Sequence, residues 1–206
     1  TKELGYTDNL VVEGEQFHLW VVEAPDSVKN EIPAKTCGLN IVFTNNMEPY
    51  RTRKVRILNG AHTSLVPVSY LYGIDKVRES LEDEVVGKFI KDAIFEEICP
   101  TLDLPEQELI QFSNAVLERF RNPYLEHDLL SISLNSISKY KTRVLPSVLE
   151  YIKRENAFPK RLLFSLAALI AFYDGDRNGV NIPLKDEQSV LDFFAAQWRA
   201  SDVKAV

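Results

Sequence analysis

The sequence has little cysteine and little histidine. It contains two cysteines, Cys37 and Cys99, and three histidines among 206 residues. The cysteines are too few and too far apart for a disulfide framework, and His18, His62 and His127 have no metal-ligand spacing to them or to one another. We therefore expect reduced thiols, as in a cytoplasmic protein, and no bound metal.

Long apolar runs and glycine-rich phosphate loops are also missing. The most apolar stretch, Leu162–Tyr173, is shorter than the roughly 20 residues that a membrane-spanning helix needs. Neither GxGxxG nor GxxxxGK[ST] occurs, so no dinucleotide fingerprint is present. A net charge of -6 provides no basic excess for phosphate backbones or anionic lipids. These absences predict that the chain binds neither nucleic acid nor membrane.

The beginning of the chain carries no signal for secretion. No positively charged start precedes an apolar core, which again favours a cytoplasmic location. The chain begins at Thr1 rather than at a methionine and enters strand-like sequence almost at once. We therefore expect it to be a piece of a longer protein.

Residues 1–49 have the character of β-structure. The runs Phe17–Val22 and Leu39–Thr44 are rich in β-branched and aromatic residues, and turn-forming residues bound each run. Two strands cannot make an independent core, so we expect them to pair with each other or to join a sheet outside this chain. His18, inside the first run, is expected to be packed or hydrogen-bonded.

Helical spacing dominates from Pro49 onward. A first helix is predicted to end near Val66, because Pro67 removes a backbone hydrogen bond and crowds the preceding turn. One amphipathic helix is predicted over 76–98, with apolar residues recurring at helical spacing. Its inward face would be Val77, Leu81, Val85, Phe89, Ala93 and Ile94.

Further helices are predicted to complete the domain. They would cover 105–120, 125–155 with a separation near Pro146, 161–173 and 187–198. The helix over 161–173 is apolar on every side, so we expect it at the centre of the bundle. The prediction is a mainly α fold, with a multi-helix domain over 50–206 and a short β segment over 1–49.

One acidic segment looks like part of a calcium loop. Asp174–Gly179 has acids or amides at positions 1, 3 and 5 and glycine at position 6. Position 12 must supply a bidentate glutamate, and here it is Lys185. We interpret the segment as a turn between two helices.

Polar side chains gather in the stretch Tyr50–Pro67. Asn59 and His62 would be i,i+3 neighbours on one helix face, with Lys54 about two turns before His62. A lysine in a desolvated cleft beside other cations has a lowered pKa and can act as a general base. Asn59 could donate a hydrogen bond to a developing alkoxide, and His62 could orient a hydroxyl. The pattern alone fits a solvated basic face with a capping asparagine equally well.

A resemblance favours the catalytic alternative. Lys54-Val-Arg-Ile-Leu-Asn59-Gly-Ala-His62 has the form K-x-x-x-x-N-x-x-H, which resembles the active-site signature of the long-chain polyol (mannitol) dehydrogenase family. The segments Gly14–Trp20 and Leu134–Pro146 resemble the same family. In that family an N-terminal Rossmann domain binds NAD, and a helical C-terminal domain, similar to that of 6-phosphogluconate dehydrogenase, binds the substrate. The resemblance implies that this chain is the substrate domain, with two strands that complete the sheet of an absent Rossmann domain.

The resemblance also implies a chemistry, namely metal-independent hydride transfer between NAD and a sugar acid. Lys54 would be the general acid/base, Asn59 would polarise the reacting oxygen, and His62 would bind a neighbouring hydroxyl. A further oxyanion-stabilising asparagine of the family comes from the N-terminal half and has no counterpart here. The residues expected to contact the substrate and its carboxylate are Arg51, Lys139, Lys141 and Arg143.

The substrate that the resemblance favours is a hexuronate. The three segments are most similar to the members that interconvert D-tagaturonate and D-altronate, and the alternatives are fructuronate reduction or mannitol-type polyol oxidation. Without the cofactor domain, the chain alone is expected to be inactive. An alternative of another class is a noncatalytic helical interaction domain, whose basic run docks an acidic partner.

Overall fold

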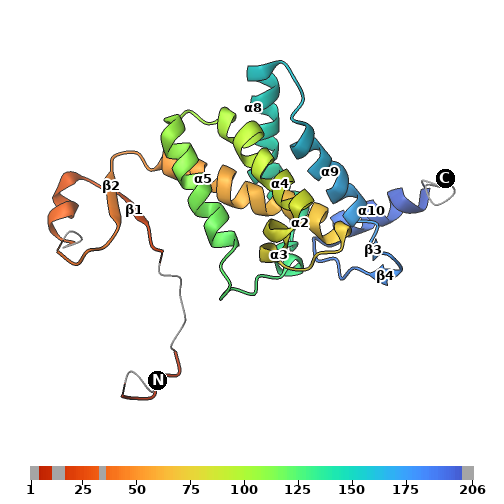
Figure 1. Cartoon of the computed structure of the whole chain (residues 1–206), viewed down its shortest axis with the longest axis horizontal. Helices are drawn as coiled ribbons and strands as arrows, with labels where there is room; N and C mark the ends of the chain where they lie inside the picture. Colours follow the sequence, from red (N-terminus) through yellow and green to blue (C-terminus); the bar gives the residue numbers. More distant parts are fainter. Residues whose placement is uncertain (1–4, 11–16, 33–35, 201–206) are drawn as a thin grey trace. The chain divides into compact units, whose positions relative to one another are not determined.

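The structure is a computed structural model that describes residues 5–10, 17–32 and 36–200. The chain divides into two compact units, residues 1–50 and 51–206, and the helices and strands carry the labels of Figure 1. No helix within the described ranges is long and apolar enough to cross a membrane.

The first unit contains a parallel pair of strands. β1 (Trp20–Glu23) pairs with β2 (Ile41–Thr44), and a short 3₁₀ helix, η1 (Asp26–Asn30), lies between them in sequence. Both predicted strands are confirmed, although each begins later than the pattern indicated. His18 lies just before β1, and its Nε2 accepts a hydrogen bond from the Asn40 N–H at 2.8 Å, as expected. Residues 14–16, the start of one resembling segment, lie outside the described residues.

The rest of the chain is mainly helical, which confirms the predicted fold class. The elements are α1 (Glu48–Arg53), the π-helix η2 (Lys54–Asn59), α2 (Gly60–Tyr72), α3 (Val77–Glu82), α4 (Glu84–Asp92), the π-helix η3 (Ala93–Ile98), the 3₁₀ helix η4 (Cys99–Thr101), α5 (Glu106–Phe120), α6 (Leu129–Ile132), α7 (Ser136–Arg143), α8 (Leu145–Glu155), α9 (Lys160–Phe172), the hairpin strands β3 (Asp176–Arg177) and β4 (Val180–Asn181), and α10 (Gln188–Ala200).

The central helix of the second unit is α2. It contacts α9, α7, α6, α4 and α3. Of these, α3, α4 and α9 are labelled beside α2 in Figure 1. The prediction that α9 would be central was wrong, because Phe164 and Ile170 on its outer face are 57% and 44% exposed. Small buried residues, among them Gly60 and Ala61, allow several helices to approach α2 closely. The apolar character of α9 on every side, on which the prediction was based, does not show which helix can be approached this closely.

The helix expected to end at Val66 passes through Pro67, so that boundary was wrong. Packing around α2 compensates for the single backbone donor that proline lacks. α2 ends instead at Gly73, whose φ of 111° is in the left-handed region that glycine tolerates. The Gly73 N–H donates to the Tyr70 carbonyl and the Ile74 N–H donates to the Ser69 carbonyl, at 3.1 and 3.0 Å.

The single helix predicted over 76–98 was also wrong. Asp83 interrupts it, and its carboxylate accepts hydrogen bonds from the backbone N–H groups of Val85 and Val86 at 3.0 and 2.8 Å. This N-cap ends α3 and starts α4. The interruption shifts the buried face by one residue, so Val86 and Ile90 are buried while Val85 is 64% exposed.

The segment Asp174–Gly179 forms a turn, which confirms that interpretation. β3 and β4 pair antiparallel, and Asn178 and Gly179 between them have φ values of 54° and 85°. Two successive positive φ angles at Asn-Gly are typical of a two-residue hairpin turn.

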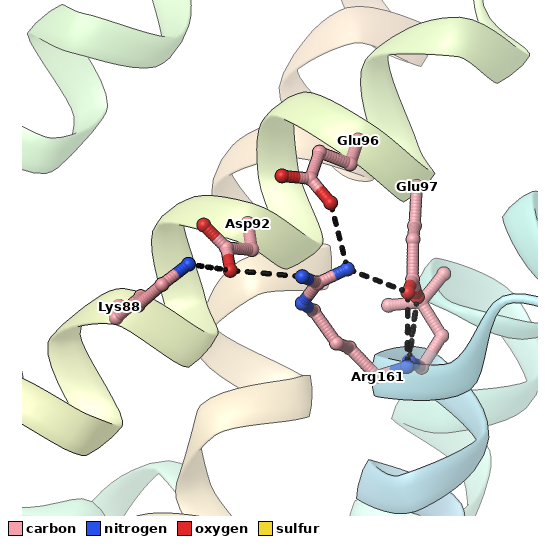
Figure 2. A network of polar contacts seen from close by, with 6 residues as sticks. Lys88, Asp92, Glu96, Glu97 and Arg161 are labelled. Atoms are coloured by element: carbon pink, nitrogen blue, oxygen red, sulfur yellow. Dashed lines mark hydrogen bonds and ion pairs between the residues drawn. The ribbon is translucent and has the colours of Figure 1, made fainter.

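A buried carboxylate joins α9 to η3. Glu97, 3% exposed, accepts hydrogen bonds from the backbone N–H groups of Arg161 and Leu162 at the start of α9, at 2.9 to 3.1 Å (Figure 2). The Arg161 guanidinium also contacts Asp92 at 2.8 Å and Glu96 at 2.9 Å. Glu97 therefore satisfies donors that the first turn of a helix leaves unpaired.

Candidate active site

The predicted polar stretch lies on a continuous helical run whose middle is π-helical. In η2 the backbone bonds join residues five apart, as from the Gly60 N–H to the Val55 carbonyl. Residues five apart then lie about one turn apart, whereas a regular α-helix would separate Lys54 and Asn59 by about 140°. His62 follows three residues after Asn59, so both lie on one face of the helix. The π turn thus gathers the three residues more closely than the regular helix assumed from the sequence.

Lys54 and Asn59 are available for a substrate. Lys54 is exposed and makes no hydrogen bond or ion pair with any residue that the structure describes. The half-buried Asn59 accepts a hydrogen bond from Thr63 Oγ1 at its backbone carbonyl, at 2.8 Å, and its side chain makes no hydrogen bond with any described residue. Its side chain does not cap α2, so the structure does not support a purely capping role. The desolvated cleft expected around Lys54 is not formed by the described part of the chain.

His62 lies in an aromatic environment. Its ring stacks on Phe120 with centroids 4.0 Å apart, and His127 approaches its edge with centroids 5.4 Å apart. Burial, followed by repulsion from His127, Arg143 and Arg119, lowers the pKa of His62 to about 3. The ring is therefore neutral near pH 7, with one nitrogen that donates and one that accepts. Such a neutral ring can form a hydrogen bond with a hydroxyl group of a substrate.

The basic residues of α7 do not all face the same way. Lys139 and Arg143 are four residues apart on one face and are both half-buried. Burial lowers the pKa of each, and the Arg143 charge lowers that of Lys139 further. Lys139 Nζ donates to the Ile132 carbonyl at 2.7 Å. Lys141 is exposed and lies about 200° around the helix from Lys139.

Arg143 lies beside the turn that carries Asn59 and His62. A Cβ atom on Gly60 would lie 3.1 Å from the Arg143 carbonyl oxygen, so the absence of a side chain lets α7 approach α2 closely. Within the described ranges, Arg143 has no carboxylate partner. A half-buried guanidinium without a counter-ion is suited to bind a carboxylate group of a ligand.

In the basic run before Asn59, two arginines contact neighbouring helices, while another arginine and the lysine are exposed. Arg53 contacts Glu108 at 3.5 Å and lies over the Phe112 ring on α5 at 4.4 Å. Arg56 donates to Ser147 Oγ on α8 at 3.2 Å. These two arginines hold the π segment against neighbouring helices. Arg51 is exposed and remains, with Lys54, on the accessible side.

The exposed Lys54 side chain leaves the site open at this residue in the described chain. Two cavities of about 640 and 570 Å³ occur elsewhere, the first bounded by β4 and α10 and the second by Tyr70, Lys76 and Pro183. Neither is lined by Lys54, Asn59 or His62. Sequence reasoning did not identify Phe120 and His127 as neighbours of His62, because only folding brings residues that far along the chain beside it.

Comparison with protein families identifies one that covers most of the chain. The model of the mannitol dehydrogenase C-terminal domain matches residues 46–205. The chain belongs to this family. The resemblance inferred from the sequence is thereby confirmed.

Named relatives of the chain are oxidoreductases. This chain is 47% identical over 196 residues to altronate oxidoreductase from Yersinia pestis, and 46% identical over 202 residues to altronate oxidoreductase from Bacillus subtilis. These matches cover 95% and 98% of this chain but 41% of each relative. The chain therefore spans less than half the length of the relatives that it matches.

Two solved structures share the fold. Mannitol 2-dehydrogenase from Pseudomonas fluorescens, a ternary complex with NAD and D-mannitol, matches 80% of this chain and 33% of its own, with a TM-score of 0.70 and 24% identity. A substrate-free D-sorbitol dehydrogenase matches 76% of this chain and 32% of its own, with a TM-score of 0.68 and 22% identity.

Proposed function

We propose that this chain is the substrate-binding and catalytic domain of an NAD-dependent hexuronate oxidoreductase that interconverts D-tagaturonate and D-altronate. The observation that carries the proposal is the combination of an uncommitted Lys54 and Asn59 on a π turn with a neutral His62 and an unpaired, half-buried Arg143. The altronate oxidoreductase relatives support the substrate class.

Each residue has a separate task. In the reductive direction the Lys54 ammonium donates a proton to the reacting oxygen, and in oxidation the lysine amine accepts it. The Asn59 amide donates a hydrogen bond to the same oxygen, where negative charge develops. His62 holds a neighbouring hydroxyl. The nicotinamide supplies or accepts the hydride when NAD is bound, and since Lys54 and Asn59 serve the oxygen, the proposed reaction needs no metal.

Arg143 and Lys139 would select a sugar acid over a neutral sugar. An arginine binds a carboxylate through two parallel hydrogen bonds, and such charge-assisted bonds are stronger than those to hydroxyl groups. The half-buried position of both cations strengthens this attraction. Fructuronate carries a carboxylate too, so fructuronate reduction remains the nearest alternative, followed by oxidation of a neutral polyol such as mannitol.

The cofactor is proposed to be bound by an N-terminal Rossmann domain of the same protein. The residues that the structure describes contain no glycine-rich loop for a pyrophosphate. β1 and β2 are parallel, and parallel strands normally belong to larger sheets that are covered on both faces. Phe17 and Trp20 are 45% and 56% exposed. The first unit therefore fits as an edge of such a sheet. The free thiols of Cys37 and Cys99 fit a cytoplasmic enzyme.

An assay of the full-length protein tests the proposal. NADH oxidation is measured with tagaturonate, fructuronate and fructose, for the parent enzyme and for Lys54→Met. We expect tagaturonate to be the best substrate and the variant to lose about 100-fold or more in kcat, since general acid–base catalysis contributes that much. Equal rates on fructose would refute a carboxylate-binding site, and full turnover by Lys54→Met would refute the catalytic assignment.

A further inference from the structure

The imidazole of His62 is held by the end of α5 and by the loop that follows it. We propose that Phe120 and His127 are positioning residues for His62, with Phe120 supporting the ring face and His127 its edge. The proposal rests on the proposed function, in which His62 binds a substrate hydroxyl. A histidine can orient a substrate hydroxyl only if the ring nitrogen that bonds to it keeps a fixed direction.

Phe120 fixes the plane of the imidazole. It is the last residue of α5, is 5% exposed, and stacks on His62 with an interplanar angle of 23°. α5 also packs against the π segment that carries Lys54 and Asn59. The helix that supports His62 therefore packs directly against the segment that carries the other two site residues.

His127 closes the edge of the imidazole. The two rings meet at 73°, an edge-to-face arrangement that aromatic pairs favour. The side-chain nitrogens of His127 have no hydrogen bond to any residue within the described ranges. Among the described residues, the ring contact of this side chain is with His62.

The loop that carries His127 is fixed on both sides of it. The Val77 N–H donates to the His127 carbonyl at 3.0 Å. Lys76 Nζ lies 3.2 Å from a Glu126 carboxylate oxygen and 2.8 Å from an Asp128 oxygen. Lys76 and Asp128 also form a β-bridge. An exposed connection that would otherwise move is therefore held where His127 meets His62.

The charged groups around His62 favour its neutral form. Arg143 approaches from α7, Arg119 from α5 and His127 from the loop, and each disfavours an imidazolium. Removing the aromatic support would admit water to the ring and let it rotate. The pKa of His62 should then rise, and activity should become sensitive to pH in the range where histidine ordinarily titrates.

The experiment uses the full-length enzyme and the variants Phe120→Leu, His127→Leu and Lys76→Met. The matched control is Tyr124→Leu, a change in the same loop at a side chain that is 94% exposed. The values of kcat and KM for tagaturonate are measured between about pH 5 and 8, around the ordinary pKa of histidine. In parallel, ¹⁵N-histidine NMR follows the titration of His62, whose signal is identified by its loss in His62→Gln.

We expect kcat/KM to fall about 10-fold in Phe120→Leu and His127→Leu, mainly through kcat, because small misplacements of substrate-positioning groups cost rate. The His62 signal should begin to titrate at higher pH in both variants. Lys76→Met should shift both readouts in the same direction by a smaller amount, and Tyr124→Leu should leave them unchanged. His127→Phe, which keeps an aromatic edge, should recover at least half of the lost rate.

The outcomes separate two possible failures. If His62→Gln is impaired while His127→Leu and Lys76→Met keep the parental kinetics and His62 titration, positioning is refuted and the proposed function stands. If His62→Gln retains full activity, the proposed role of His62 is refuted as well. Should Phe120→Leu fail to fold, His127→Leu and Lys76→Met decide the question, since neither removes a core side chain.

Discussion

At the scale of single residues, His62 shows how folding changes the chemistry of a side chain. An exposed histidine titrates near 6.5, whereas the surroundings of His62 lower its pKa to about 3. Burial is the largest cause, and the Phe120 ring stacks on one face of the imidazole. A catalytic proton donor must titrate near the working pH, so His62 is better suited to bind a hydroxyl than to transfer a proton.

The first prediction concerns acid unfolding. The unfolded chain binds a proton at His62 near pH 6.5 and the folded chain only near pH 3, so acid favours unfolding between these values and leaves stability unaffected above them. We expect His62→Gln to lose less stability than the parent chain between pH 7.5 and about 4.5, as urea unfolding followed by circular dichroism would show. Tyr124→Leu, at a side chain that is 94% exposed, is the control. Equal losses in His62→Gln and the parent would contradict the expected burial of His62.

The second prediction concerns the carboxylate of the substrate. In the full-length enzyme, Arg143→Met should raise KM for tagaturonate about 10- to 100-fold, because a hydrogen bond to a charged group is worth about 1.5 to 3 kcal/mol. Lys139→Met should act in the same direction, and the KM for fructose should change little. Lys141→Met, on the other side of α7, is the matched control. Equal effects of Arg143→Met on both substrates would show that Arg143 does not bind the carboxylate.

At the scale of helices, local polar groups decided boundaries that hydrophobic periodicity could not. Asp83 divided one predicted helix and shifted its buried face by one residue. Pro67, by contrast, did not end α2, because neighbouring helices cover it on several sides. The stop of α5 after Phe120 was predicted correctly, since Asn122-Pro123 is a strong local signal. Boundaries set by adjacent residues were therefore predictable, and those that depend on packing were not.

The third prediction concerns Glu97, whose carboxylate binds the first turn of α9. Glu97→Ala leaves the backbone N–H groups of Arg161 and Leu162 without their acceptor and removes a buried charge from Arg161 (Figure 2). We expect the free energy of unfolding to fall by about 3 kcal/mol or more, as for other broken buried pairs. Glu96→Ala removes an exposed partner of the same arginine and should cost under about 1 kcal/mol. Similar losses in the two variants, measured by urea unfolding, would contradict a capping role for Glu97.

At the scale of the whole molecule, the proposed function makes this chain one side of an active site. Lys54 is exposed, and the cavities of about 640 and 570 Å³ lie away from it. The relatives extend well beyond the matched part, which is 41% of their length. A second domain that covers Lys54 would supply the desolvation that its proposed chemistry requires.

The fourth prediction separates the chain from its parent protein. The 206-residue chain should not oxidise NADH in the presence of tagaturonate, while the full-length protein should do so. Dialysis of the full-length protein against EDTA should leave its kcat unchanged, because in the proposed reaction a lysine and an asparagine serve the reacting oxygen. Turnover by the chain alone would show that it binds the cofactor itself. A loss of activity that zinc or magnesium restores would refute metal independence.

The sequence by itself determined the mainly α class, the two strands, the turn at Asp174–Gly179 and the family, because these depend on local preferences and on a short signature. Only the tertiary structure placed α2 at the centre and brought Phe120, His127 and Arg143 to the neighbourhood of His62. It also left Lys139 and Arg143 half-buried and Lys141 exposed. The physical reason is that burial, and with it the protonation of a histidine or the pairing of an arginine, depends on residues distant in sequence. No local pattern contains that information.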